Sequence, residues 1–117
     1  MKNVTIYHNP RCSKSRETLA LLEQYGVQPD VVLYLETPPS VTQLTTLLQQ
    51  LGFSSARELM RKKEDLYKSL NLADDSLSEQ QLLQAMVENP KLIERPIVVK
   101  GKQARIGRPP EQVLDIL

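Results

Sequence analysis

The chain of 117 residues has one cysteine and one histidine. A single thiol excludes a disulfide framework. Because no export signal opens the chain either, we expect a cytoplasmic protein in a reducing environment. One histidine by itself cannot define a metal site, and the sequence contains no cluster of metal-ligating residues. We therefore expect no metal centre.

Long apolar runs and a strong net charge are also missing. No hydrophobic segment is long enough to span a bilayer, so we expect no membrane association. The net charge of +1 gives no electrostatic reason to expect nucleic acid binding. Residues 36–94 carry six basic and nine acidic groups, whereas residues 95–117 carry five basic and two acidic ones. The basic excess near the C-terminus and around Cys12 indicates a local anion site.

Hydrophobic periodicity predicts a βαβ unit at the start of a single domain that spans residues 1–117. Alternating apolar residues predict a strand over 4–8. Leucines at helical spacing follow, up to a stop at Gly26. The β-rich run at 31–35 is typical of a buried strand. A helix between two such strands predicts that they run parallel.

Three capping boxes predict a helical insertion over about 40–89. In a capping box, two side chains three residues apart satisfy free amides of the first helical turn. The boxes are Ser40 with Gln43, Ser55 with Glu58, and Ser78 with Gln81. They predict helices that begin near residues 41, 56 and 79. Gly52 suits the end of the first helix, and Asn89-Pro90 suits the end of the last.

The last quarter of the chain predicts a β-hairpin and a short terminal helix. Strand signals at 97–100 and 104–106 flank a turn at Gly101-Lys102. Pro109-Pro110 suit the first turn of the helix. The order of all these elements predicts an α/β fold, in which helices flank a mixed four-stranded sheet.

Cys12 stands where the first strand gives way to a helix, after a turn at Asn9-Pro10. Unpaired backbone N–H groups and the helix dipole favour a thiolate there. Three basic residues add positive charge nearby: Arg11, Lys14 and Arg16. Free cysteines are often buried and inert, but this basic setting lowers a cysteine pKa and favours a nucleophile. Ser15 stands where a dithiol motif has its second cysteine, so any redox cycle through Cys12 needs a second thiol from another molecule.

Arginines are the candidates for the anion site. Arg95 precedes the predicted hairpin and Arg108 follows it, so the hairpin can bring both to one sheet edge. Guanidinium groups bind tetrahedral oxyanions through paired hydrogen bonds. Arg57 and Arg61 are one helical turn apart and are typical of surface residues that pair with acidic neighbours. His8 is either a structural residue at a strand end or, as an imidazolium, a stabiliser of the thiolate.

Five segments resemble the glutaredoxin-coupled arsenate reductases of bacteria, and the match runs the full length of the chain. The segments are IYHNPRC at 6–12, VLYLETP at 32–38, ARELMRK at 56–62, ERPIVV at 94–99 and GRP at 107–109. The resemblance implies a thioredoxin-like fold with a helical insertion, and a cis peptide bond before Pro96.

The resemblance also implies roles for particular residues. Cys12 is the implied catalytic thiol, and three arginines are the implied anion ligands: Arg61, Arg95 and Arg108. His8 and Ser15 are the implied thiolate-stabilising residues. Cys12 would attack arsenate, glutathione would attack the arsenic adduct, and glutaredoxin would complete the reduction to arsenite. Glutathione is then a co-substrate, no tightly bound cofactor is implied, and we expect a monomer.

Two other functions stay open. The first is a general thiol oxidoreductase that acts on glutathione mixed disulfides. The second is a regulator that binds RNA polymerase, because such regulators share the implied fold. Those regulators typically use a C-x-x-C redox switch, which Ser15 removes here, and the near-neutral charge is not a DNA-binding signature.

Overall fold

The structure is a computed structural model that describes residues 4–117. It forms two compact units. One combines residues up to 37 with residues 95–117, and the other comprises residues 38–94. Whether they act as the single domain expected from the sequence stays a prediction. The first unit contains β1 (Val4–Tyr7), α1 (Ser13–Gln24), β2 (Asp30–Val32), β3 (Ile97–Lys100), β4 (Gln103–Ile106) and the 3-10 helix η3 (Pro110–Ile116).

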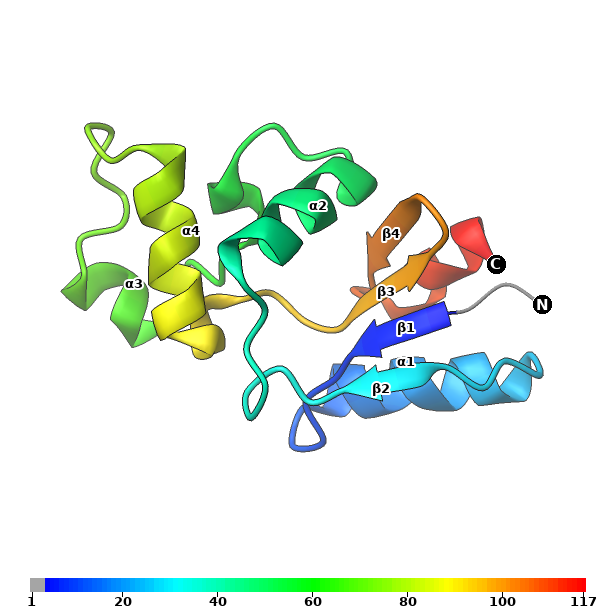
Figure 1. Cartoon of the computed structure of the whole chain (residues 1–117). Coiled ribbons are helices and arrows are strands. Elements are labelled where there is room, and N and C mark those ends of the chain that lie inside the picture. Colours follow the sequence, from blue (N-terminus) through cyan, green and yellow to red (C-terminus); the bar gives the residue numbers. More distant parts are fainter. Residues whose placement is uncertain (1–3) are drawn as a thin grey trace. The chain divides into compact units, whose positions relative to one another are not determined.

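A mixed four-stranded sheet organises the first unit (Figure 1). Its strand order is β2-β1-β3-β4. β1 runs parallel to β2 and antiparallel to β3, and β4 pairs antiparallel with β3. The predicted βαβ unit, hairpin and mixed sheet are therefore confirmed.

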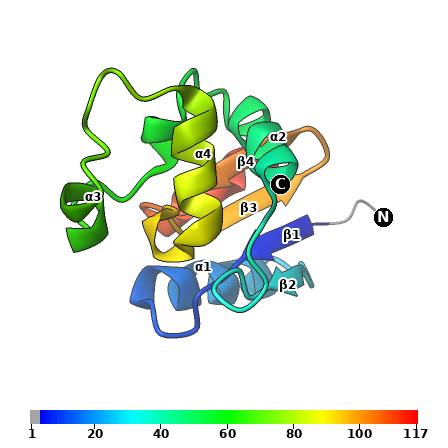
Figure 2. The ribbon, with the colours of Figure 1, turned by 60° about the vertical axis from the view of Figure 1, so that its left-hand side comes forward.

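One face of this sheet carries a hydrophobic core. Alternate strand residues point to the same side, which places Val4, Ile6 and Val98 on that face. They pack with Leu22 of α1 and with Val113 and Ile116 of η3. Figure 1 and Figure 2 show α1 running along this face. The core anchors α1 to β1, and the turn between these two elements contains Cys12.

The strand predicted over 31–35 is wrong in length and in burial. β2 ends at Val32 and forms an edge of the sheet, where Val31 is 46% exposed. The chain then turns, because the amides of Glu36 and Thr37 both donate to the Leu33 carbonyl. Tyr34 is 1% exposed, so its burial explains an apolar pattern that resembles a strand.

The second unit is helical, as predicted (Figure 1). It contains α2 (Val41–Leu51), the 3-10 helix η1 (Ala56–Leu59), α3 (Asp65–Ser69), α4 (Glu79–Glu88) and the 3-10 helix η2 (Pro90–Leu92). All three capping boxes form. Gly52 ends α2 with φ of 76°, and Asn89 ends α4.

The helix predicted to begin near residue 56 is a single 3-10 turn. Met60 is extended and forms an isolated antiparallel bridge with Ile93. The Arg61 amide donates to the Leu92 carbonyl, and the Glu94 amide donates to the Leu59 carbonyl. The backbone groups that would continue the helix therefore pair with a distant segment. No sequence signal indicated this pairing, and none indicated α3.

The terminal segment differs from expectation in detail. The predicted short helix is present as the 3-10 helix η3, with Pro110 in its first turn. The peptide bond between Arg95 and Pro96 is cis, which confirms the expectation from the resemblance. The bond between Arg108 and Pro109 is also cis, which the sequence did not indicate.

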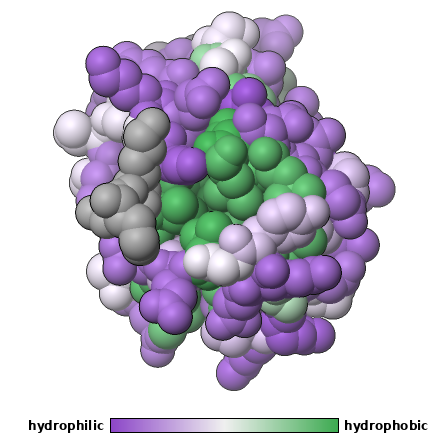
Figure 3. Space-filling model, turned by 90° about the vertical axis from the view of Figure 1, so that its right-hand side faces the viewer, coloured by the Kyte–Doolittle hydropathy of each residue, from purple (hydrophilic) through white to green (hydrophobic). Residues whose placement is uncertain are grey.

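The surface combines polar and apolar areas. On the face drawn in Figure 3, hydrophobic residues gather in one area, and hydrophilic residues lie next to it. Over the described residues, no helix has both the length and the apolar character needed to cross a membrane.

The capping box of α4 yields a stability prediction. The Gln81 amide donates to Ser78 Oγ at 3.1 Å, and the Ser78 amide donates to Gln81 Oε1 at 2.7 Å. Ser78→Ala removes the first bond and should lower the free energy of unfolding by about 1 kcal/mol in urea denaturation. Gln80→Ala, an exposed change in the same helix, is the control. Equal free energies for the two variants would contradict a stabilising cap.

Candidate active site

Cys12 is the N-cap residue of α1 and follows the carboxyl end of β1. Its amide donates to the Asn9 carbonyl at 3.0 Å, which closes the turn. Its carbonyl accepts from the Arg16 amide at 3.0 Å, which is the first bond of the helix. The thiol is 9% exposed. The turn thus holds the sulfur at the helix N-terminus, where free amides favour negative charge.

The pKa of the Cys12 thiol lies below its ordinary value. Burial by itself raises this pKa, but the Ser15 amide, the charge of Arg95, the Lys14 amide and the charge of Arg108 lower it further than burial raises it. Arg108 contacts the thiol, with Nη2 at 3.6 Å from Sγ. The thiol is therefore poised to ionise, and the thiolate is the nucleophilic form.

The cations that act on Cys12 are not the nearby ones that the sequence suggested. Lys14 Nζ lies 3.8 Å from Glu17 Oε1, and Arg16 Nη1 donates to the Pro10 carbonyl at 2.9 Å. These basic side chains of the Cys12 turn therefore have other partners. The charges that lower the Cys12 pKa come from Arg95 and Arg108.

Strand register explains how both arginines reach the thiol. Tyr7, the last residue of β1, pairs with Ile97, the first residue of β3, and Ile97 pairs with Ile106, the last of β4. Arg95 and Arg108 therefore flank the hairpin at the sheet edge where β1 ends. Arg108 Nε donates to the Arg95 carbonyl at 2.8 Å, which orients its guanidinium. The predicted meeting of these residues at one edge is confirmed.

His8 and Ser15 form a buried pair beneath the turn. His8 is 6% exposed and Ser15 is fully buried. Ser15 Oγ lies 2.6 Å from His8 Nδ1 and also accepts from the Asn9 amide at 3.0 Å. Burial, and then the charge of Arg16, lower the pKa of His8. A lowered pKa favours the neutral ring, and the contacts of Ser15 with His8 and the Asn9 amide support a role in holding the turn. The thiolate-stabilising role expected for His8 stays a prediction.

Arg61 and Arg57 both lie in the helical unit. Arg61 Nη1 lies 3.0 Å from Glu64 Oε2. Its place in the anion site stays a prediction. Arg57 differs from the surface ion pair expected for it, because Nε donates to the Leu72 carbonyl at 3.0 Å and Nη2 to the Asp74 carbonyl at 2.6 Å. Arg57 therefore stabilises a loop of its own unit.

Gly107 is a residue whose role sequence reasoning missed. It is buried, and its amide donates to the Pro96 carbonyl at 2.9 Å. A Cβ at this position would lie 2.9 Å from Pro96 Cγ and would also collide with Thr18 of α1. The absent side chain thus lets the segment that carries Arg108 approach α1. The GRP motif at 107–109 was the available sequence signal for Gly107, but it indicated a role for Arg108 alone.

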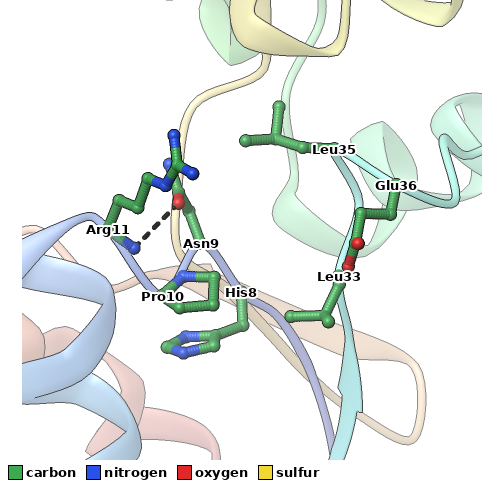
Figure 4. A pocket seen from close by; sticks show the side chains of 7 residues that line it. All are labelled: His8, Asn9, Pro10, Arg11, Leu33, Leu35 and Glu36. Carbon is green, nitrogen blue, oxygen red and sulfur yellow. Dashed lines mark hydrogen bonds between the residues drawn. The ribbon is translucent and has the colours of Figure 1, made fainter.

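A pocket of about 350 Å³ lies beside the Cys12 turn (Figure 4). One wall is the segment from His8 to Arg11, and the other comprises Leu33, Leu35 and Glu36. Within residues 4–117, no group of three or more histidine, cysteine, aspartate or glutamate side chains is placed to hold a metal ion.

The fold and the site together define a thioredoxin-like α/β protein with one activated thiol beside arginines. Residues 7–116 match the model of the ArsC family. The chain belongs to the ArsC family.

Individual relatives agree with this assignment. The Escherichia coli K12 protein YfgD, whose name states no activity, is 72% identical over 99% of this chain and 98% of its own length. A Haemophilus influenzae protein named arsenate reductase is 56% identical over 98% of this chain and 99% of its own. The solved structure of an arsenate reductase from Vibrio cholerae has a TM-score of 0.98 at 65% identity, and covers 99% of this chain and 98% of that one.

The Arg108 contact yields a prediction about the thiol. Arg108→Ala removes a positive charge beside Sγ, so the pKa of Cys12 should rise. The measurement is the rate of iodoacetamide alkylation against pH, whose midpoint reports the thiolate fraction. Arg105→Ala is the matched control, because Arg105 lies in β4 and faces Asp115 at 3.9 Å. A midpoint that moves equally in both variants would show that Arg108 has no special effect.

Gly107 yields a second prediction. Gly107→Ala should lower the free energy of unfolding by about 1–3 kcal/mol through overpacking. It should also raise the pKa of Cys12, because Arg108 moves with the displaced segment. Gly101→Ala, at the other end of β4, is the control: its φ of 62° disfavours alanine, but a Cβ there meets nothing within 4 Å. An unchanged Cys12 pKa in Gly107→Ala would refute the positioning role.

Proposed function

We propose that this protein reduces arsenate to arsenite through Cys12, with glutathione and glutaredoxin as the sources of electrons. The observation that carries the proposal is the thiol at the start of α1, whose pKa is lowered and whose sulfur lies 3.6 Å from Arg108 Nη2. Support also comes from the relatives named arsenate reductases, one of them 56% identical over almost the whole chain.

The first step is attack of the Cys12 thiolate on arsenic. A sulfur–arsenic bond forms, and one arsenate oxygen leaves as water after taking up protons. Arg95 and Arg108 bind the remaining oxyanion, because planar guanidinium groups match its paired oxygens. Arg61 is the third anion ligand in this proposal, which requires its guanidinium to share or leave its contact with Glu64. His8 and Ser15 hold the turn that presents the thiolate.

The later steps need two thiols from outside. Glutathione adds to arsenic and a second water leaves. The glutaredoxin thiolate then attacks the glutathione sulfur and forms a mixed disulfide. The electron pair of the broken arsenic–sulfur bond stays on arsenic, which becomes As(III). Hydrolysis of the Cys12–arsenic bond releases arsenite and restores the thiol. Ser15 in place of a second cysteine is consistent with this dependence on external thiols.

The proposal also includes where the protein acts and its oligomeric state. A single cysteine suits the cytoplasm, where thiols stay reduced, and the protein would act there as a monomer. A low-pKa thiol also suits the transfer of glutathione from mixed disulfides, so this activity is the main competitor. The assay below separates the two.

The proposal predicts arsenate-dependent NADPH oxidation when glutathione, glutaredoxin and glutathione reductase are supplied. Cys12→Ser should abolish it. Arg95→Ala and Arg108→Ala should each lower kcat/KM for arsenate by roughly 10- to 100-fold, the equivalent of a charge-assisted hydrogen bond of about 1.5–3 kcal/mol. Arg105→Ala is the control and should stay near wild type.

Two results would overturn the proposal. One is arsenate turnover that survives Cys12→Ser. The other is turnover of a glutathionylated peptide with none of arsenate, which would identify a thiol oxidoreductase instead. Equal losses in Arg108→Ala and Arg105→Ala would remove Arg108 from the anion site.

A further inference from the structure

We propose that the pocket beside the Cys12 turn binds glutathione by its two charged ends, with Arg11 as the carboxylate ligand and Glu36 as the ammonium ligand. This inference rests on the proposed function, which requires an external thiol. It assigns that thiol a site built from this chain's own residues.

The pocket has the size and walls of a small-molecule site. Its volume of about 350 Å³ lies at the lower end of the range of about 300–1,000 Å³ for ligand pockets, which suits a tripeptide. Figure 4 shows Arg11 and Pro10 on one side, with Leu35 and Glu36 on the other. Leu35 is 38% exposed, so the pocket offers an apolar surface for methylene groups between polar ends.

The charges of the two walls are opposite. Arg11 lies on the wall of the Cys12 turn and Glu36 on the facing wall (Figure 4). Among the described residues, neither side chain takes part in an ion pair. Both side chains are therefore available to a ligand that carries a carboxylate and an ammonium some distance apart. Glutathione has its glycyl carboxylate at one end and its γ-glutamyl ammonium at the other.

The turn that forms one wall also presents the reactive sulfur. Arg11 immediately precedes Cys12, and the Asn9 carbonyl accepts from the Cys12 amide at 3.0 Å. Asn9 Oδ1 accepts from the Arg11 amide at 3.0 Å, which holds the backbone of this wall. A peptide bound between the walls therefore lies beside the turn that would carry the arsenic adduct, because the lining of the pocket ends at Arg11, the residue before Cys12.

The proposed glutathione site also assigns a role to Arg11. The sequence suggested that Arg11 tunes the thiol, but the charges that lower the pKa of Cys12 come from Arg95 and Arg108. A guanidinium in the pocket wall can instead bind a carboxylate with two parallel hydrogen bonds.

The experiment measures binding of S-methylglutathione, which has no free thiol, by calorimetry. Arg11→Gln and Glu36→Gln should each raise its Kd about tenfold, the equivalent of 1.4 kcal/mol. In the coupled assay, the KM for glutathione should rise more than the KM for arsenate. Arg105→Gln and Glu111→Gln are charge-matched controls, in β4 and η3, and should bind as wild type does.

A modified ligand tests which end meets Arg11. S-methylglutathione with its glycyl carboxylate esterified should bind wild type and Glu36→Gln more weakly than the free acid does. Arg11→Gln should bind the ester and the acid alike, because its carboxylate ligand is already gone. An ester penalty that persists in Arg11→Gln would overturn the assignment.

The outcomes separate this inference from the proposed function. Arsenate turnover by wild type, with S-methylglutathione binding that is absent or unchanged in both pocket variants, would refute the pocket and leave the reduction standing. Binding that depends on both charges, without any arsenate turnover, would support the pocket and refute the reduction. Binding that the control variants lose equally would reveal non-specific electrostatic attraction and also overturn the inference.

Discussion

The chemistry of this protein depends on the approach of a guanidinium to a buried sulfur at a helix N-terminus. Burial deprives the Cys12 thiolate of water, which raises the cost of its charge. The amides that open α1 and the charges of Arg95 and Arg108 replace that solvation. Arg108 comes from a position 96 residues further along the chain. The local amides of α1 thus begin to lower the pKa of the thiol, and the tertiary structure adds the positive charge of two distant arginines.

The approach of Arg108 to Cys12 depends in turn on strand pairing and on the close packing of uncharged residues. β3 pairs with β1 so that the hairpin begins and ends beside the Cys12 turn. Gly107 then lets the returning chain pack against Thr18 and Pro96, where a side chain would collide. Strand register and the close packing at Gly107 together determine where the Arg108 guanidinium lies. Arg108 is further held by its bond to the Arg95 carbonyl.

Local signals predicted the elements that depend on local interactions. The Ser40 and Ser78 boxes marked the starts of α2 and α4 correctly, because a cap is satisfied within four residues. The Ser55 box also forms, yet its helix lasts one turn because Met60 pairs with Ile93. The prediction of a strand around Tyr34 is wrong, because burial in a turn and burial in a strand select the same apolar residue types.

The sequence by itself determined the lone nucleophile, its place before a helix, and the arginines at both ends of a hairpin. Resemblance to a known family, rather than periodicity, added Arg61, which lies in the helical unit and whose part in the site stays a prediction. The tertiary structure decided which cations act on the thiol: Arg95 and Arg108, while Lys14 and Arg16 engage nearby groups. The physical reason is that the effect of a cation on a thiol pKa weakens with distance and with solvent screening. The number of residues between the two groups in the sequence determines neither the distance nor the screening.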